Sequence, residues 1–141
     1  MAQNIEVTPD LESAFKKALE AQKNAYAPYS NYKVGACIIG QSGESFIGCN
    51  IENASYGGTV CAERVAIFNA VSSGKAQKLK AIVLVTQNSK AAAPCGFCRQ
   101  VLSEFVSADF PIYLANQSEI QKKTTLGELL PMAFSPDALK K

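Results

Sequence analysis

The amino-acid sequence predicts an α/β fold in which a mixed sheet lies between layers of helices. Segments with helical periodicity alternate along the chain with segments of strand periodicity, which favours this class. Two strand-like segments in the first third are separated by a short turn, as in a hairpin. Residues 79–86 form a continuous apolar run that is typical of a central strand covered on both faces. The 141 residues are 48% hydrophobic, so we expect one domain, residues 1–141, with a substantial core.

The individual elements follow from these periodicities. Helices are predicted over residues 8–26, 61–74, 98–106 and 125–130. Strands are predicted over residues 34–40, 44–50, 79–86 and 111–116. Residues 41–43 (Gln-Ser-Gly) predict the tight hairpin turn, and residues 51–59 have turn-forming composition without a period, so a loop is expected there.

Several residues mark the ends of the predicted helices. Thr8 is suited to the N-cap of the first helix and Pro9 to its first helical position. Gly74 is placed to end the second helix, because glycine tolerates the left-handed conformation that often follows a helix. Thr125 and Glu128 have capping-box spacing and predict the start of the short last helix.

Charge and hydropathy bear on the partners of the chain. The formal net charge is +2, from 14 basic and 12 acidic residues, so no polyanion such as a nucleic acid is expected as partner. The first ten residues lack the basic start and apolar core of a secretion signal, and no apolar run approaches the roughly 20 residues that span a bilayer. We therefore expect a cytoplasmic protein without a membrane partner.

The cysteine and histidine counts restrict the chemistry. The number of cysteines, five, is odd, and a reducing compartment is expected, which favours metal binding or catalysis over disulfides. The sequence has no histidine, so Ser–His and Cys–His nucleophile pairs and histidine metal ligands are excluded. Acid–base chemistry must then depend on a carboxylate, a lysine, a tyrosine or a metal-bound water.

Three cysteines lie at the starts of two predicted helices. Cys95 and Cys98 form a C-x-x-C, and Cys61 begins a different helix. Thiolates at these positions can converge on one ion, and zinc with three protein ligands keeps a fourth position for water. The partial positive charge of each helix N-terminus favours the thiolate form.

The C-x-x-C by itself leaves other readings open. It could be a redox pair, half of a structural zinc site, or a coincidence. A closed zinc site would need a fourth ligand, which only Cys37 or Cys49 could supply. Both of these cysteines lie in apolar strand patterns, where buried and inert cysteines are common.

Glu63 favours the catalytic reading. It lies two residues after Cys61, where a carboxylate can reach the open coordination position without being a ligand. Three thiolates and one Zn²⁺ carry a net negative charge, which makes the metal a poorer Lewis acid. The two arginines of the sequence, Arg64 and Arg99, each follow a site residue and could offset this by donating hydrogen bonds to the sulfurs. Solvated surface roles remain the alternative for both.

These motifs resemble the zinc-deaminase signature, in C-A-E (61–63) and P-C-G-F-C-R-Q (94–100). With A-Y-A-P-Y-S, V-G-A, G-C-N-I-E-N-A-S-Y and E-L-L-P-M-A-F, the sequence resembles the small homotetrameric zinc-dependent cytidine deaminases from about Tyr26 to Leu139. The resemblance implies a three-layer α/β/α sandwich with a central mixed sheet of about five strands. It also implies Zn²⁺ as cofactor and a small-molecule nucleoside substrate. The implied reaction is hydrolytic deamination of cytidine and 2'-deoxycytidine to uridine and 2'-deoxyuridine, with release of ammonia, in pyrimidine salvage.

The resemblance also assigns roles to individual positions. Zinc ligands are matched by Cys61, Cys95 and Cys98, and the proton shuttle by Glu63. Asn50 and Glu52 match residues that bind the ribose hydroxyls, and Tyr32 matches a ring that stacks on the base. The Ala62 backbone matches a contact to the pyrimidine, and Arg64 matches a donor of hydrogen bonds to the ligand sulfurs. Phe134 matches an aromatic residue that reaches the base pocket of a neighbouring subunit. Without the resemblance, an ordinary solvated loop would be the preferred reading of Asn50 and Glu52.

Two departures and three rival functions accompany this hypothesis. The family commonly has phenylalanine and proline where this chain has Tyr32 and Lys33, and Phe97 is bulkier than the family leads us to expect. The nearest rival is a deaminase of another small aminopyrimidine, such as a blasticidin-like nucleoside. Nucleic-acid editing is disfavoured by the near-neutral charge. A non-catalytic zinc module would leave Glu63 unexplained.

Overall fold

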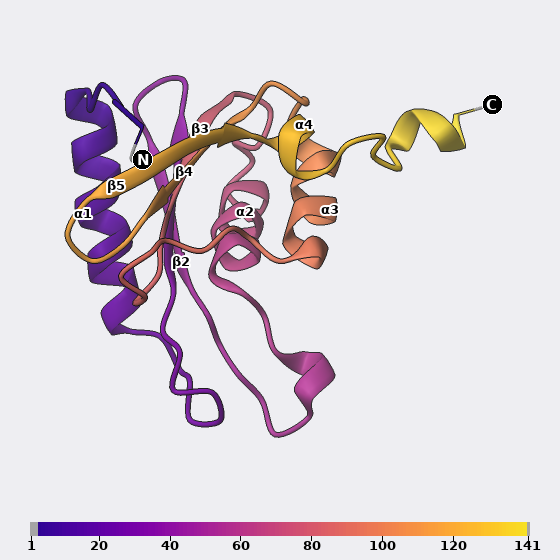
Figure 1. The fold of residues 1–141 in the computed structure, drawn as a ribbon. Coiled ribbons are helices and arrows are strands. Elements are labelled where there is room, and N and C mark those ends of the chain that lie inside the picture. The colour runs from indigo at the N-terminus through magenta and orange to yellow at the C-terminus, as the bar shows by residue number, and fades with distance from the viewer. Residues whose placement is uncertain (1–2, 141) are drawn as a thin grey trace.

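A computed structural model describes residues 3–140 as a five-stranded sheet with helices on both faces (Figure 1). The strands are β1 (Gly35–Gly40), β2 (Ser45–Cys49), β3 (Leu79–Val85), β4 (Pro111–Ala115) and β5 (Ile120–Thr125). The helices are α1 (Pro9–Lys23), α2 (Ala62–Ser72), α3 (Gly96–Phe105) and α4 (Leu126–Leu129), with 3₁₀ turns at Tyr56–Gly58 and Pro136–Leu139. The predicted α/β class, with a mixed sheet of about five strands between helical layers, is confirmed.

The strand order is β2-β1-β3-β4-β5. β1 pairs antiparallel with both β2 and β3, β3 pairs parallel with β4, and β4 pairs antiparallel with β5. The parallel pair requires a crossover, and α3 supplies it between β3 and β4. The carboxyl end of β3 therefore leads through a loop directly to the start of α3, where the C-x-x-C lies.

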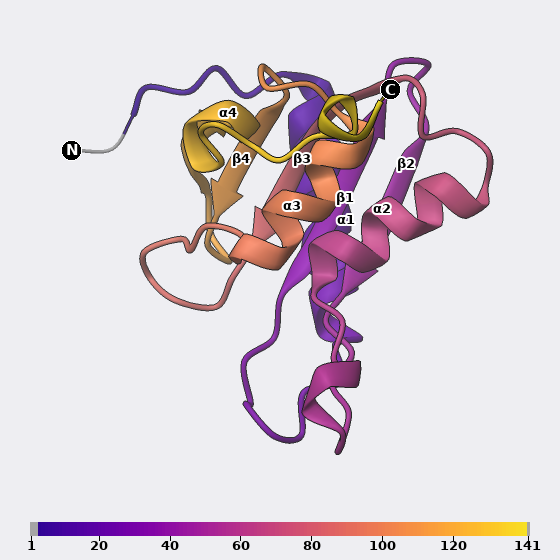
Figure 2. The ribbon, with the colours of Figure 1, turned by 90° about the vertical axis from the view of Figure 1, so that its right-hand side faces the viewer.

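Period-two alternation in the central strands divides the core into two layers. Ala36 and Ile38 face α2, whereas Cys37 and Ile39 face α1. β3 is buried along most of its length, as its continuous apolar run predicted. Figure 1 shows α1 on one side of the sheet, and Figure 2 looks onto the other side, where α2 and α3 lie. Among the described residues, no helix combines the length and the hydrophobicity needed to cross a bilayer.

The predicted helix and turn signals act locally as expected. Thr8 Oγ1 accepts the Leu11 N–H at 3.3 Å, and Thr125 Oγ1 accepts the Glu128 N–H at 3.2 Å. Gly43 in the hairpin turn and Gly74 after α2 have φ angles of 89° and 76°, which glycine adopts without steric cost.

Two predicted helix ends were wrong, and one strand was missed. α1 ends at Lys23 and not at residue 26, because the Tyr26 N–H donates to Asn50 O at 3.0 Å instead of continuing the helix. β5 was not among the four strands predicted from periodicity: it is an edge strand whose exposed lysines remove the apolar alternation. α3 begins at Gly96 and not at residue 98, so Cys95 is its N-cap residue and Cys98 lies in its first turn.

Gly48 allows α2 to approach the sheet closely at the end that carries Cys61 and Glu63. A Cβ atom at Gly48 would lie 2.4 Å from Ala62 O and 2.5 Å from Ala66 N, both of them backbone atoms that cannot move independently. Only glycine permits this contact between β2 and the first turns of α2. The close approach fixes the start of α2 against the sheet, and with it the position of the predicted site residues Cys61 and Glu63.

Candidate metal centre

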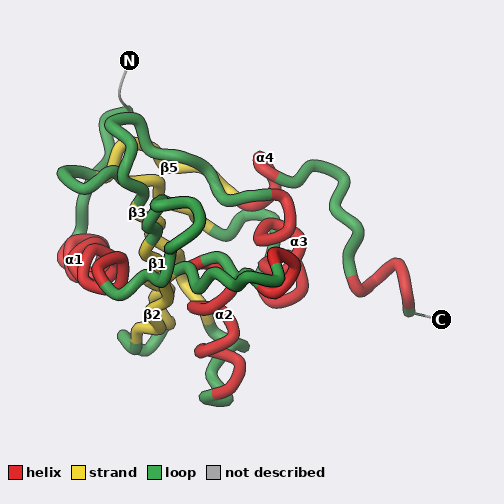
Figure 3. Tube along the Cα trace, turned by 90° about the horizontal axis from the view of Figure 1, so that it is seen from below, coloured by secondary structure: helices red, strands yellow, loops and turns green. Residues whose placement is uncertain are grey.

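The starts of α2 and α3 bring three cysteine sulfurs together. Cys61 is the N-cap residue of α2, Cys95 is the N-cap residue of α3, and Cys98 lies one turn into α3. The two helices lie next to each other on the same face of the sheet (Figures 2 and 3). The Cys61 and Cys95 sulfurs are 3.8 Å apart, the Cys95 and Cys98 sulfurs are 3.5 Å apart, and all three lie within 4.8 Å of one another. We call these three atoms the sulfur cluster.

The sulfur cluster has the dimensions of a zinc site. Zn–S bonds of about 2.3 Å in tetrahedral geometry place neighbouring sulfurs roughly 3.8 Å apart, close to the observed separations. Among the described residues, neither Cys61 nor Cys95 makes a side-chain capping bond to its helix, so both sulfurs remain available as metal ligands. The cluster can therefore hold one metal ion with three ligands and leave one tetrahedral position for solvent or substrate.

The protonation of the metal-free cluster is unequal. The pKa of Cys61 is lowered to about 5, first because the Cys98 thiol donates a hydrogen bond to it and then, against the cost of burial, by Arg64 and Cys95. The pKa of Cys98 is raised far above its usual range by the same shared hydrogen bond and by burial. The pair thus holds one thiolate and one thiol, and binding of a metal ion displaces the remaining proton.

Arg64 is the charged partner of the cluster. Its Nη2 atom donates to Cys61 Sγ and to Thr59 O, each at 3.4 Å. Burial opposes the charge of the guanidinium, but the bonds to the thiols of Cys61 and Cys98 outweigh it and raise the pKa of Arg64. A cation held at this point offsets the negative charge of thiolate ligands.

Arg99 does not have the role considered for it. Its Nε atom donates to Pro94 O at 2.8 Å, and its Nη1 atom donates to Leu129 O at 2.8 Å. It therefore connects the loop before α3 to the end of α4 and points away from the sulfurs. Of the two arginines, Arg64 alone has a described hydrogen bond to a cluster sulfur.

Glu63 lies in the first turn of α2 with only 4% of its surface exposed. Burial raises the pKa of its carboxyl to about 7. Its own backbone N–H opposes this rise, the Cys61 thiolate adds to it, and Cys98 and Arg64 oppose it. These neighbours place the carboxyl beside the sulfur cluster, and a carboxyl with this pKa can accept and release a proton near neutrality.

Asn50 and Glu52 are buried, and both hold the segment that precedes β1. Asn50 Oδ1 accepts the Val34 N–H at 2.9 Å, and Asn50 Nδ2 donates to Tyr32 O at 2.7 Å. Glu52 Oε1 accepts the backbone N–H groups of Tyr29 and Ser30 at 2.9 and 3.0 Å, and Oε2 accepts the Ser30 hydroxyl. The Ser30 hydroxyl bond is the main reason that the pKa of Glu52 is lowered.

The other predicted substrate contacts occupy different settings. The Tyr32 hydroxyl donates to Asn88 Oδ1, which fixes the ring at the edge of the loop after β3. Ala62 is fully buried as the first residue of α2. Phe134 is 61% exposed in the C-terminal segment, which extends away from the sheet and helices (Figures 1 and 3). Gln100 holds the backbone of this segment through a 2.8 Å bond from Nε2 to Phe134 O.

Sequence reasoning assigned no role to several residues that organise the site. Ser30 holds Glu52, and Gln22 Nε2 donates to Lys33 O at 2.9 Å, which ties α1 to the segment before β1. Ser30 lies within the A-Y-A-P-Y-S motif, so the resemblance marked its position without a function. No sequence pattern marked Gln22 as a site residue, because a glutamine on a helix is ordinarily solvated and its contact with Lys33 depends on tertiary packing.

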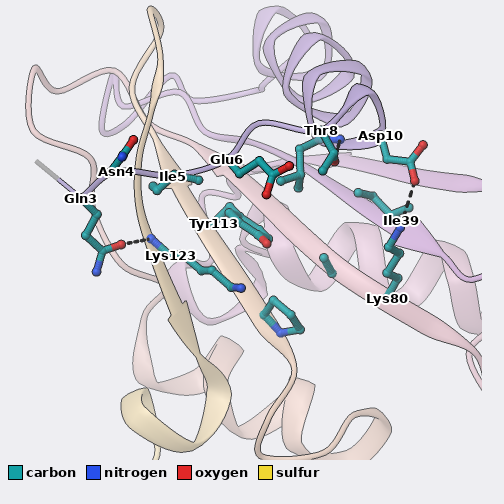
Figure 4. A pocket seen from close by; sticks show the side chains of 13 residues that line it. Gln3, Asn4, Ile5, Glu6, Thr8, Asp10, Ile39, Lys80, Tyr113 and Lys123 are labelled. Carbon is teal, nitrogen blue, oxygen red and sulfur yellow. Dashed lines mark hydrogen bonds and ion pairs between the residues drawn. The ribbon is translucent and has the colours of Figure 1, made fainter.

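A cavity of about 700 Å³ lies elsewhere, on the face of the sheet that α1 covers. Residues 3–6, Tyr113 and Lys123 line it (Figure 4). Asp10 and Lys80 form an ion pair of 2.9 Å at its edge, which neutralises both charges. None of the predicted site residues lines this cavity, so it is separate from the sulfur cluster.

Comparison with known proteins agrees with this geometry. Residues 8–114 match the family described as the cytidine and deoxycytidylate deaminase zinc-binding region. A cytidine deaminase of Sporosarcina psychrophila is 42% identical over 130 residues, which are 92% of this chain and 95% of that protein. A cytidine deaminase of Halalkalibacterium halodurans is 45% identical over 129 residues, 91% of this chain and 96% of that protein.

The chain is also similar in fold to solved structures of cytidine deaminases. The crystal structure of cytidine deaminase from Burkholderia pseudomallei has a TM-score of 0.83 and 43% sequence identity, and covers 87% of this chain and 98% of that one. The matched family is a zinc-binding one, in agreement with a sulfur cluster of zinc-site dimensions. On its sequence, its fold and its sulfur cluster, this chain belongs to the cytidine and deoxycytidylate deaminase zinc-binding family.

Proposed function

We propose that this chain is a zinc-dependent deaminase of free pyrimidine nucleosides. It hydrolyses cytidine and 2'-deoxycytidine to uridine and 2'-deoxyuridine and releases ammonia. The observation that carries the proposal is the buried Glu63 carboxyl beside three sulfurs that together fit one zinc ion. A non-catalytic zinc module would have no use for a carboxyl whose pKa burial raises to about 7 at that place.

Cys61, Cys95 and Cys98 hold the zinc ion. When bound, zinc lowers the pKa of a water molecule toward neutrality and so supplies the nucleophile. Glu63 would move the protons: its carboxylate would take one from the attacking water and pass it to N3 of the cytosine ring while the hydroxide adds to C4. Glu63 would then take the remaining proton of the hydroxyl at C4 and deliver it to the amino group, so that the C4–N bond breaks, ammonia leaves and the C4 carbonyl of uridine forms. One carboxyl can do both because the transfers are sequential.

In this proposal, Asn50, Glu52, Tyr32 and Ala62 select a nucleoside. Asn50 and Glu52 bind the ribose hydroxyls in this proposal, because both are buried and held in place by the segment before β1. A buried carboxylate that already accepts several hydrogen bonds keeps lone pairs for a hydroxyl donor. The Tyr32 ring stacks on the base, and the Ala62 backbone at the start of α2 contacts the pyrimidine. Tyr32 and Lys33 distinguish this site from those of the family, which commonly has phenylalanine and proline at these two positions.

We also propose that the chain acts as a cytoplasmic homotetramer. A reducing compartment keeps the three thiols available for metal. The C-terminal segment carries apolar side chains that its own chain does not cover, with Met132 fully exposed and Phe134 and Leu139 more than half exposed. In a tetramer, Phe134 reaches the base pocket of a neighbouring subunit. Analytical ultracentrifugation should give four times the 15.0 kDa chain mass, and a monomer at micromolar concentration would contradict the assembly.

The direct test is an absorbance assay with cytidine. We expect conversion to uridine with one ammonia released per turnover, loss of activity after treatment with a chelator, and recovery when zinc is added back. A blasticidin-like nucleoside offered in competition measures selectivity for the ribose-bearing substrate. The proposal fails if zinc-loaded protein releases no ammonia from cytidine or deoxycytidine.

A further inference from the structure

Phe97 stands between the two cysteines of the C-x-x-C and lies outside the core. Its side chain is 66% exposed, on the first turn of α3. Its ring centroid is 4.4 Å from the central carbon of the Arg64 guanidinium. This separation is well inside the range of cation–π contacts. The exposed ring therefore has a specific partner, which is the arginine that contacts the sulfur cluster.

The Arg64 guanidinium is confined on several sides. Its Nη2 atom donates to Cys61 Sγ and Thr59 O. Its Nε atom is buried and has no hydrogen-bond partner among residues 3–140. Phe97 covers the guanidinium with its ring. Without that cover, water could solvate the guanidinium and compete for its hydrogen-bond donors.

We propose that Phe97 is a positioning residue, which holds Arg64 against the Cys61 sulfur and thereby stabilises the metal-loaded sulfur cluster. The inference rests on the zinc site of the proposed function. The contact also crosses between the two helices that carry the ligands, because Arg64 belongs to α2 and Phe97 to α3. It thus connects the helix that begins at Cys61 to the helix that begins at Cys95.

The direction of the effect follows from charge. Three thiolates and Zn²⁺ sum to a net charge of about −1, and the Arg64 guanidinium lies at hydrogen-bond distance from one of the ligand sulfurs. Metal binding removes the thiol protons, and with them the hydrogen bonds that the thiols donate to Cys61, so the bond from Arg64 becomes more important in the loaded site. Because Phe97 keeps water from the guanidinium, it strengthens this interaction locally.

Four variants of the full-length protein separate the aromatic contact from simple packing. Phe97→Leu keeps an apolar side chain but removes the π face, and Phe97→Tyr keeps the ring. Arg64→Gln removes the cation, alone and combined with Phe97→Leu, which completes a double-mutant cycle. For each variant, zinc affinity is measured by competition with a chromophoric chelator. The sulfur-to-metal charge-transfer band is recorded on the cobalt(II)-loaded protein, and thermal unfolding verifies the fold.

We expect Phe97→Leu to weaken zinc binding about two- to fivefold, the size of an exposed cation–π contact. The charge-transfer band should move to longer wavelength, because a thiolate with a weaker hydrogen bond gives up an electron more easily. Phe97→Tyr should behave as wild type, and Phe97→Leu should have no further effect in the Arg64→Gln background.

Either no loss in Phe97→Leu, or a loss that Phe97→Tyr shares or that persists with Arg64→Gln, overturns the positioning role. Failure of the proposed function looks different, because wild-type protein would then bind no zinc at the cluster or leave cytidine unchanged. A wild-type protein that binds zinc and deaminates cytidine, with a Phe97→Leu variant indistinguishable from it, refutes only the role of Phe97.

Discussion

Glu63→Gln should retain its zinc ion and lose at least about 10²- to 10⁴-fold in turnover rate, the typical contribution of a general acid–base group. Glutamine has the shape of glutamate and can fill the same buried site, so the sulfur cluster stays intact. Its amide, however, can neither take the proton of the attacking water nor deliver one to the leaving amine. Burial raises the pKa of Glu63 to about 7 in the metal-free site, which is in the range of a group that takes up and releases protons near neutral pH.

Steady-state kinetics with cytidine, together with zinc content by atomic absorption, measure this loss. The matched control is Glu104→Gln, the same chemical change at an exposed position of α3. It should leave both the rate and the metal content unchanged. A Glu63→Gln variant with most of its activity intact would assign the proton transfers to another group, and a variant without zinc would show that Glu63 is needed to build the site.

The features of the fold that could be predicted from the sequence are those that depend on contacts between residues close together in the chain. Thr8, Gly43 and Gly74 fix helix and turn ends through contacts within a few residues, and the structure has each where the pattern placed it. β5 was missed because an edge strand pairs with one neighbour and exposes its lysines, so its alternation is polar. The early end of α1 depends on the hydrogen bond from Tyr26 to Asn50, which is 24 positions further along the chain and invisible to periodicity.

The site divides in the same way. Cysteines at two helix starts could be predicted to converge, because helix N-termini attract thiolates and zinc prefers sulfur. The partners of Arg64 and Arg99 could not be separated from sequence, since each arginine follows a site residue. Tertiary packing determines their different roles. Arg64 contacts Cys61 and Phe97, whereas Arg99 donates hydrogen bonds to the carbonyl groups of Pro94 and Leu129. The large residue at position 97, unexplained by sequence, acquires a partner only when α2 and α3 lie together.

Removal of one ligand sulfur should greatly weaken zinc binding and abolish deamination. Cys95→Ala is the sharpest variant because Cys95 is exposed, so its loss leaves no cavity in the core. Four-ligand zinc sites bind with roughly 10–16 kcal/mol, so one thiolate contributes on the order of 3–4 kcal/mol. This corresponds to about 10²- to 10³-fold in zinc affinity. Deamination should be lost along with the metal, and Cys61→Ala and Cys98→Ala should behave in the same way.

Cys49→Ala is the control for this series, since Cys49 is a half-buried thiol at the end of β2 and outside the sulfur cluster. It should bind one zinc ion per chain, as the wild type does, and keep its activity. Chelator competition on all four variants distinguishes the readings that sequence left open. If Cys49→Ala lost zinc like the others, Cys49 would be a fourth ligand and the site a closed structural one. If Cys95→Ala kept its zinc and its activity, three sulfurs would not be needed, and the geometric basis of the proposed deaminase would be gone.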